Sequence, residues 1–353
     1  MSANERALNV LILGLGGNVS QGILKALRMG SLDCHVVGAC ITPAAAGLYA
    51  TDYAVLSPPA ADPSFVEWLT GTCQSHSVDA VLSGVEPVLE VLAEHRETIE
   101  GTGARSIVSP PEMLAIGGDK LLTANWLQQQ GLRYPLSAAA EDGGEMRRMV
   151  DRCGYPLLAK PRRGKGSDGI ITVSDERGLD YVCGLADYVV QEYLGSAEEE
   201  YSCGCFSDAE GKVRGCIVMR RRLSGGTTSQ VRVGEFADVR EEAIAIATAL
   251  GPAGPCNVQL RQTDRGPVCF EINVRFSGTT PLRAHFGFNE VEAALRQMVL
   301  GEPPRDMPLV TGGTAVRYWS EVYIDPAGPG RLAAEGELDS PGGYAEFFDM
   351  ARS

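Results

Sequence analysis

The chain has 353 residues, of which 44% are hydrophobic and 22% charged, an ordinary composition for a globular protein of two or three domains. Its formal net charge of -14 argues against nucleic acid or an anionic membrane as a partner, because both are bound through concentrated basic side chains. The sequence shows no basic-then-apolar leader and no apolar run long enough to span a membrane, so we expect a cytoplasmic protein. The ten cysteines lie largely in apolar runs, which favours buried, reduced thiols over disulfides or zinc ligands.

The N-terminal third alternates short apolar runs with helical patterns, which predicts a parallel α/β sheet with right-handed crossovers. Strands are expected at 8–13, 34–40 and 79–84, and helices at 20–29, 65–75 and 90–99. The first strand leads into a glycine-rich turn, but Val19 stands where a dinucleotide fingerprint needs its third glycine, and the second strand ends without an acid. The fingerprint therefore fails. The turn at residues 14–18 is predicted either to hold an anion on its backbone N–H groups or to be a plain strand-to-helix turn.

Strands dominate the following region, which predicts a separate α+β domain. Helices are expected at 110–134 and 239–250, and strands at 156–160, 170–173, 188–193, 200–206 and 213–221. We expect a first domain over residues 1–112, a second over 113–310 divided at residue 190, and a C-terminal β-containing tail over 311–353.

Residues 256–276 form the most informative segment, a predicted β-hairpin with a three-residue loop at 264–266. This loop places Thr263 opposite Pro267 and Gln259 opposite Glu271. Side chains alternate along a strand. One face is therefore predicted to carry Asn257, Gln259, Arg261, Glu271, Asn273 and Arg275, and the other Val258, Leu260, Phe270, Ile272, Val274 and Phe276. The polar face is either solvated or, because it combines a carboxylate, amide oxygens and a guanidinium, suited to a hard cation that carries phosphate.

Three further motifs each have two interpretations, one as a ligand-binding segment and one as an ordinary turn, loop or exposed surface. Lys160 ends a strand and precedes a glycine-rich loop at 161–169 that either covers phosphates or is simply flexible. Residues 191–194 followed by Glu200 suit a purine edge and a ribose, or form an acidic turn. Arg220 and Arg222 share a strand face that suits a carboxylate or phosphate, and we expect a mobile loop lining a substrate site directly after them, although both segments could equally be exposed surface.

Taken in this order, the motifs resemble those of ATP-grasp enzymes, most closely the ATP-grasp halves of carbamoyl phosphate synthase and their short single-unit relatives. The resemblance extends from about Leu8 to about Val310. It implies an α/β Rossmann-like pre-ATP-grasp domain followed by an α+β ATP-grasp fold. ATP and Mg²⁺, or Mn²⁺, are the implied cofactors.

The resemblance also implies roles for individual residues. The implied ATP-binding residues are Lys120, Lys160, Gly164, Lys165, Gly166, Ser167, Gln191, Glu192, Tyr193, Leu194 and Glu200. The implied metal ligands are Gln259, Glu271 and Asn273, with Lys160 and Arg275 as cations that oppose the phosphate charge. From its strand position we expect Arg220 to be a third catalytic cation. We expect substrate contacts from Glu86, Arg222, Ser224, Gly225, Gly226, Thr227 and Arg283.

The chain departs from the family pattern at three points. Gln259 stands where many carboxylate-amine ligases carry an acid, which predicts a looser second metal ion, and Val274 replaces a common proline. Only one ATP-grasp unit is present and no glutaminase accompanies it, so a complete carbamoyl phosphate synthase is not expected.

The leading functional prediction is a ligase that joins a small carboxylate, such as an amino acid, to an amine and releases ADP and phosphate. Gln259 favours an alternative in which bicarbonate is activated as carboxyphosphate. A noncatalytic nucleotide-binding protein and a dehydrogenase are the remaining alternatives. The presence of Lys160, Glu271 and Asn273 disfavours a noncatalytic protein. The failed dinucleotide fingerprint disfavours a dehydrogenase. The expected partners are small molecules, with a homodimer as the default assembly.

Overall fold

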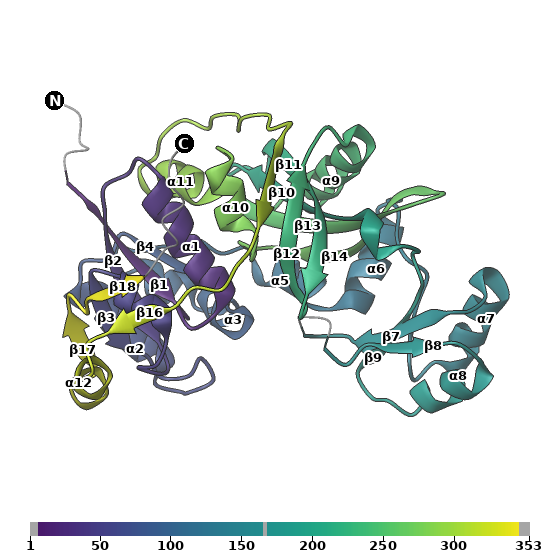
Figure 1. Cartoon of the computed structure of the whole chain (residues 1–353), viewed down its shortest axis with the longest axis horizontal. Helices are drawn as coiled ribbons and strands as arrows, with labels where there is room; N and C mark the ends of the chain where they lie inside the picture. Colours follow the sequence, from purple (N-terminus) through teal and green to yellow (C-terminus); the bar gives the residue numbers. More distant parts are fainter. Residues whose placement is uncertain (1–5, 165–167, 346–353) are drawn as a thin grey trace. The chain divides into compact units, whose positions relative to one another are not determined.

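The computed structural model describes residues 6–164 and 168–345, which divide into two compact units (Figure 1). Unit 1 contains the chain up to residue 108, residues 276–304 and the chain from residue 318 onward. Unit 2 contains residues 109–275 and 305–317. The first boundary lies close to the predicted one at 112. The division at 310 differs from the structure, because residues 276–304 and most of the tail return to unit 1.

Unit 1 is built on a six-stranded sheet in the order β17-β3-β2-β1-β4-β5. Its parallel strands are β1 (Leu8–Leu13), β2 (Cys34–Cys40), β3 (Tyr53–Leu56), β4 (Ala80–Ser83) and β5 (Arg105–Ser106). The predicted parallel α/β sheet is confirmed, and the C-terminal part of the chain adds β17 (Glu337–Asp339) antiparallel to β3. The predicted helix at 90–99 is two helices, because the chain leaves helical geometry at His95.

The helices of unit 1 connect these strands. They are α1 (Asn18–Met29), the 3-10 helix η1 (Ala46–Ala50), α2 (Phe65–Ser75), α3 (Glu86–Glu94), α4 (Arg96–Glu100) and α12 (Gly328–Glu335). A separate strand pair, β16 (Val322–Ile324) with β18 (Gly343–Ala345), completes the C-terminal part. Within the described ranges, no helix combines the length and apolar character needed to cross a bilayer.

The glycine turn after β1 has a packing explanation. Gly14 has φ +76°, and a Cβ at this position would lie 2.4 Å from Cγ2 of Val85. Ser20 Oγ donates to the Leu13 carbonyl at 2.7 Å and accepts from the Gly84 N–H at 3.0 Å. The turn is therefore compressed against the loop after β4, which requires glycine without any ligand.

Residues 276–304 contain a fully buried ion pair in unit 1. This segment forms α10 (Thr280–His285), α11 (Glu290–Ala294) and a π-helical turn (Leu295–Val299). Arg283 has 0% exposure, and its Nη2 donates to Glu290 Oε1 at 2.7 Å, Ser277 Oγ at 2.9 Å and Thr280 Oγ1 at 3.0 Å. The predicted substrate contact by Arg283 is thus corrected: its guanidinium is enclosed by the fold and holds α10 to α11.

Unit 2 contains two antiparallel sheets. The smaller, β6-β9-β7-β8, consists of β6 (Ser137–Ala139), β7 (Leu157–Pro161), β8 (Ile171–Val173) and β9 (Tyr188–Glu192). It lies beside α7 (Gly143–Cys153) and α8 (Glu176–Val182) (Figure 1). The sheet and the two helices share an apolar core that includes Met146, Leu157 and Leu179.

The larger sheet of unit 2 has the order β14-β13-β10-β11-β12-β15. Its strands are β10 (Glu200–Ser207), β11 (Val213–Ser224), β12 (Thr227–Val233), β13 (Gly254–Thr263), β14 (Gly266–Asn273) and β15 (Gly313–Val316). The helices α5 (Pro111–Gly118), α6 (Lys120–Gln129) and α9 (Ala237–Leu250) belong to the same unit. Alternate strand residues such as Cys203, Val218 and Val258 form one core with apolar residues of α9. The polar residues between them lie on the opposite face.

Truncation of the buried arginine tests its structural role. Arg283→Ala leaves the Glu290 carboxylate buried without its partner, so we expect the free energy of unfolding to fall by about 3–5 kcal/mol. The exposed pair Arg331–Glu335 provides a control in the same unit, and Arg331→Ala should cost less than about 1 kcal/mol. Urea unfolding measures both. Equal stability of the two variants would contradict the assignment.

Candidate functional site

The hairpin of β13 and β14 pairs Gln259 with Glu271 as predicted, but for a different reason. Thr263 pairs with Gly266, so the loop has two residues and the predicted three-residue loop is wrong. Gln259 pairs with Glu271 while Leu260 pairs with Cys269, which leaves Phe270 as the extra residue of a β-bulge. The bulge adds back the residue that the shorter loop removes, and the predicted pairing results.

Phe270 consequently lies on the polar side of the hairpin. Its ring centroid is 5.6 Å from Lys160 Nζ and 5.6 Å from Arg261 Cζ, distances at which a cation is attracted to the ring face. The prediction that Phe270 joins the apolar face is wrong, because alternation fails at a bulge. Cys269 belongs to the core in place of Phe270, together with Ile272, which was predicted to lie on the apolar face.

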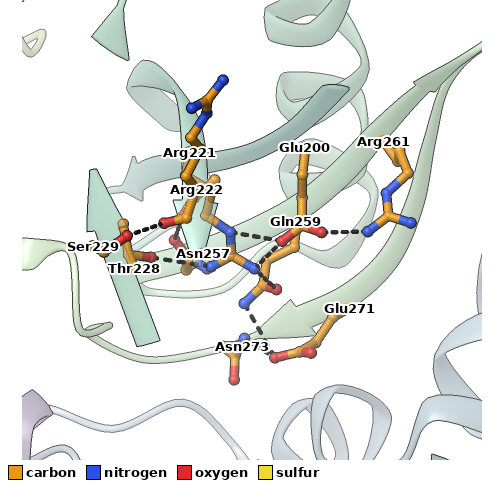
Figure 2. A network of polar contacts seen from close by, with 11 residues as sticks. Glu200, Arg221, Arg222, Thr228, Ser229, Asn257, Gln259, Arg261, Glu271 and Asn273 are labelled. Atoms are coloured by element: carbon orange, nitrogen blue, oxygen red, sulfur yellow. Dashed lines mark hydrogen bonds and ion pairs between the residues drawn. The ribbon is translucent and has the colours of Figure 1, made fainter. Parts of the chain in front are cut away.

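Glu271 accepts two amide N–H groups at the centre of the site. Its Oε1 accepts from Gln259 Nε2 at 3.1 Å and from Asn273 Nδ2 at 2.8 Å. Gln259 Oε1 in turn accepts from Arg221 Nη2 at 2.6 Å (Figure 2). The three predicted metal ligands therefore lie together, with a guanidinium bound to one of them.

Arg221 is the residue that sequence reasoning missed. Its neighbours Arg220 and Arg222 do share a face, but alternation places that face on the side of Cys216 and Val218, which belong to the core with α9. Arg220 Nε donates to the Glu198 carbonyl at 2.6 Å, and Arg222 Nη2 lies 3.2 Å from the Glu198 carboxylate. The predicted roles of Arg220 in catalysis and Arg222 in substrate binding are therefore corrected, since both are held at an acidic turn on the other side of the sheet. Counting the alternation outward from Val218 would have selected Arg221.

Glu200, the predicted ribose acid, is buried between two guanidinium groups. It is 4% exposed, and its Oε1 accepts from Arg221 Nε at 2.9 Å and Nη2 at 2.7 Å. Its Oε2 is paired with Arg261 Nη2 (Figure 2). Both carboxylate oxygens are thus engaged, so contact with a ligand hydroxyl requires Glu200 to exchange or share one of these partners.

Two lysines from the smaller sheet and α6 belong to the same site. Lys160 is 9% exposed, and its burial lowers its pKa to about 8, although the nearby Glu271 carboxylate acts in the opposite direction. Lys120 Nζ donates to the carbonyls of Pro161 and Gly164, at 3.2 Å each. Of the predicted phosphate loop, Gly164 is exposed with φ +122°, while Lys165, Gly166 and Ser167 lie outside the described residues.

The predicted base-binding segment includes the last two residues of β9, Gln191 and Glu192. Gln191 is buried, and its Nε2 donates to Ser137 Oγ at 3.0 Å. Glu192 Oε1 accepts from the Leu136 N–H at 2.8 Å and pairs with Arg265 of the hairpin loop. Tyr193 is exposed and Leu194 buried. Since the Gln191 and Glu192 side chains are engaged within the protein, base recognition there would depend on backbone groups.

The remaining predicted substrate residues and the predicted catalytic residue Arg275 lie in different parts of the fold. Ser224 pairs with Thr227, and Gly225 and Gly226 have φ of +54° and +70°, so this segment is a tight hairpin turn and not the predicted mobile loop. Glu86 is the first residue of α3 in unit 1 and is half-buried. Arg275 is half-buried at the end of the unit 2 segment.

The donors fit a hard divalent cation. Among the described residues no group of three or more His, Cys, Asp or Glu side chains is suitable for a metal ion. The polar face instead offers the Glu271 carboxylate and the amides of Gln259 and Asn273, and oxygen ligands of this kind suit Mg²⁺ when phosphate completes its coordination.

Comparisons with known proteins agree with this architecture. The family model described as "PylC-like, N-terminal domain" matches residues 10–107, and that described as "ATP-grasp in the biosynthetic pathway with Ter operon" matches residues 185–322. The carbamoyl phosphate synthase large chain of Mycobacterium tuberculosis is 26% identical over 214 residues, which cover 56% of this chain and 19% of that protein. The D-alanine--D-alanine ligase of Corynebacterium jeikeium is 25% identical over 254 residues, which cover 62% of this chain and 65% of the ligase.

Solved structures show the same fold. N5-carboxyaminoimidazole synthetase from Staphylococcus aureus, complexed with ADP, has a TM-score of 0.70 at 14% identity over 94% of this chain and 86% of its own. The protein is thus built as a PylC-like N-terminal domain followed by an ATP-grasp domain. Residues 185–322 therefore resemble ATP-grasp domains in sequence, and the chain shares the fold of the ADP-bound synthetase.

The ammonium of Lys160 provides a direct probe of the site. Glu271→Gln removes the negative charge that favours the protonated form, so the pKa of Lys160 should fall below its value of about 8. The chain has only five lysines, and Lys160→Arg identifies the relevant signal in a ¹⁵N-lysine NMR titration. Glu198→Gln, at an exposed carboxylate, serves as the control. An unchanged or raised pKa in Glu271→Gln would contradict the proximity of the two groups.

Proposed function

We propose that the protein is an ADP-forming ligase that joins a small carboxylate, such as an amino acid, to an amine. In the first step a carboxylate oxygen attacks the γ-phosphorus of ATP, which gives an acyl phosphate and ADP. The amine then attacks the acyl carbon, and inorganic phosphate leaves as the amide forms. The observation that carries this proposal is the convergence of the buried Lys160 with the Glu271, Gln259 and Asn273 group on the polar side of the larger sheet.

The proposed roles of the side chains are electrostatic and geometric. Bound ATP with Mg²⁺ supplies the phosphoryl group and part of the charge neutralisation. Glu271 and Asn273 would hold the cation, and the bulge directs Phe270 toward Lys160. Lys160, Lys120 and Arg275 would face the phosphates, and residues 191–194 with Glu200 the nucleoside. Fixed cations in a water-poor site stabilise developing charge without reorganisation.

The burial of Lys160 supports a place beside phosphate rather than beside solvent. A buried ammonium without a full counter-charge is destabilising, which is the physical meaning of its lowered pKa. A bound anion removes that penalty, so ligand binding and Lys160 protonation should favour each other.

We further propose a cytoplasmic enzyme that acts on small molecules, with a homodimer as its assembly and with Glu86 and residues 224–227 as candidates for substrate selectivity.

Activation of bicarbonate is the second candidate. It is supported by the neutral Gln259 and by the similarity to carbamoyl phosphate synthase large chains, of which the chain spans about a fifth. In that reaction a bicarbonate oxygen attacks the γ-phosphorus and ADP leaves, which gives carboxyphosphate. The amine then attacks the carboxyphosphate carbon, and inorganic phosphate leaves as the carbamate forms. Incorporation of ¹⁴C-bicarbonate into product separates it from ligation of an organic acid.

Phosphate release tests the proposal. With ATP, Mg²⁺ and a panel of amino acids and bicarbonate as carboxylates, each with and without amines, we expect amine-dependent formation of ADP and phosphate. Glu271→Gln should reduce this rate by at least about 100-fold, as expected when a group that stabilises transition-state charge is lost. Glu198→Gln changes an exposed carboxylate on the other side of the sheet and should retain the rate. Release of AMP, or full activity of Glu271→Gln, would overturn the proposal.

A further inference from the structure

Arg221 binds the side-chain oxygen of one predicted metal ligand. Its Nη2 donates to Gln259 Oε1 at 2.6 Å, and both side chains are largely buried. We infer that the site holds a single divalent cation, on Glu271 and Asn273, and that the Arg221 guanidinium takes the place of a second ion at Gln259. This inference rests on the proposed function, since it concerns the metal nucleotide bound in that site.

The neighbours of Gln259 determine which way its amide points. A guanidinium only donates hydrogen bonds and a carboxylate only accepts them. Gln259 lies between Arg221 and Glu271, at 2.6 Å and 3.1 Å, so its oxygen must face Arg221 and its nitrogen Glu271. If the amide were reversed, its NH₂ group would face the Arg221 N–H groups and its oxygen would face the Glu271 carboxylate, so neither hydrogen bond could form. The oxygen of Gln259 is therefore directed away from Glu271, toward a cation that the protein itself provides.

The position of Arg221 is fixed by further contacts. Its Nε and Nη2 bind Glu200 Oε1, and its Nη1 lies 3.5 Å from Thr228 Oγ1 (Figure 2). This three-sided attachment holds the planar guanidinium on the polar face of the sheet. An Arg remains charged at all working pH values, so it acts as a permanent cation.

The charge balance around this position also disfavours a second metal ion. The side chains of Arg221, Arg261 and Lys160 are cationic when protonated, and Glu200 and Glu271 are anionic. A divalent ion at Gln259 would adjoin the Arg221 guanidinium and would find a neutral amide as its ligand. Repulsion between cations is strong where water is scarce.

Counting bound Mn²⁺ tests the inference. Free Mn²⁺ is measured by EPR while Mn²⁺ is titrated into the full chain with a nonhydrolysable ATP analogue. We expect one Mn²⁺ per chain in the unaltered protein. The double variant Arg221→Gln, Gln259→Glu removes the guanidinium and provides a carboxylate, so it should bind two ions. Two ions about 3.5–4 Å apart give a spin-coupled spectrum, which is a second readout.

Matched variants make the result decisive. Arg221→Lys keeps the charge and should retain one ion, and Arg220→Gln alters the same strand on its other face and should also retain one. Two ions in the unaltered protein, or one ion in a double variant whose near-UV circular dichroism is native, would overturn the inference alone. If the double variant is not native, the number of Mn²⁺ ions bound by the single variant Arg221→Gln is compared with the number bound by Arg221→Lys. We expect Arg221→Gln to bind more Mn²⁺, and equal numbers would overturn the inference. Failure of the folded, unaltered protein to bind Mn²⁺ with nucleotide would overturn the proposed function, and the inference with it.

Discussion

The β-bulge at Phe270 is the constraint on which the arrangement of the site depends. Side chains alternate along a strand, so a slip of one residue transfers every side chain to the other face. The two-residue loop alone would oppose Glu271 to Val258. One extra residue in β14 restores Glu271 to Gln259 and keeps Cys269 and Ile272 in the core. The same irregularity gives Lys160 and Arg261 an aromatic neighbour.

Buried charge is the second organising feature, and it is arranged differently in the two units. In unit 1, Arg283 and Glu290 form a fully buried ion pair that connects two helices. In unit 2, Glu200 joins Arg221 and Arg261, and Arg221 continues the chain of contacts through Gln259 to Glu271. Lys160 is buried beside this series of contacts, and its burial lowers its pKa. A site that stores uncompensated positive charge is suited to an anionic ligand, and the ATP-grasp fold is consistent with a nucleotide in that role.

Much of the fold could be predicted because its signals are local. The strand patterns of β1, β2 and β4 and the hairpin of β13 and β14 follow from runs of apolar residues and turn chemistry. The strand β17 could not be predicted in the same way, because three residues near the C-terminus gain their structure only by pairing with β3. The tertiary contact overrides any preference that so short a segment possesses.

The candidate site shows the same division between local and nonlocal signals. The grouping of Gln259, Glu271 and Asn273 was accessible from alternation, even though the loop length and the bulge were each missed and their effects cancelled. Arg221 was missed because three consecutive arginines offer no internal clue to which face is buried, and the answer lies in the core contacts of Val218. The burial of Arg283 was equally hidden, since it depends on Glu290 across two helices.

We propose that the polar face of this hairpin binds a metal nucleotide. Anomalous scattering from a crystal grown with Mn²⁺ and a nonhydrolysable ATP analogue tests it most directly. We expect a peak about 2 Å from oxygens of Glu271 and Asn273, with the phosphates beside Lys160. A metal nucleotide bound elsewhere, for example at the glycine turn after β1, with no peak at Glu271, would contradict it.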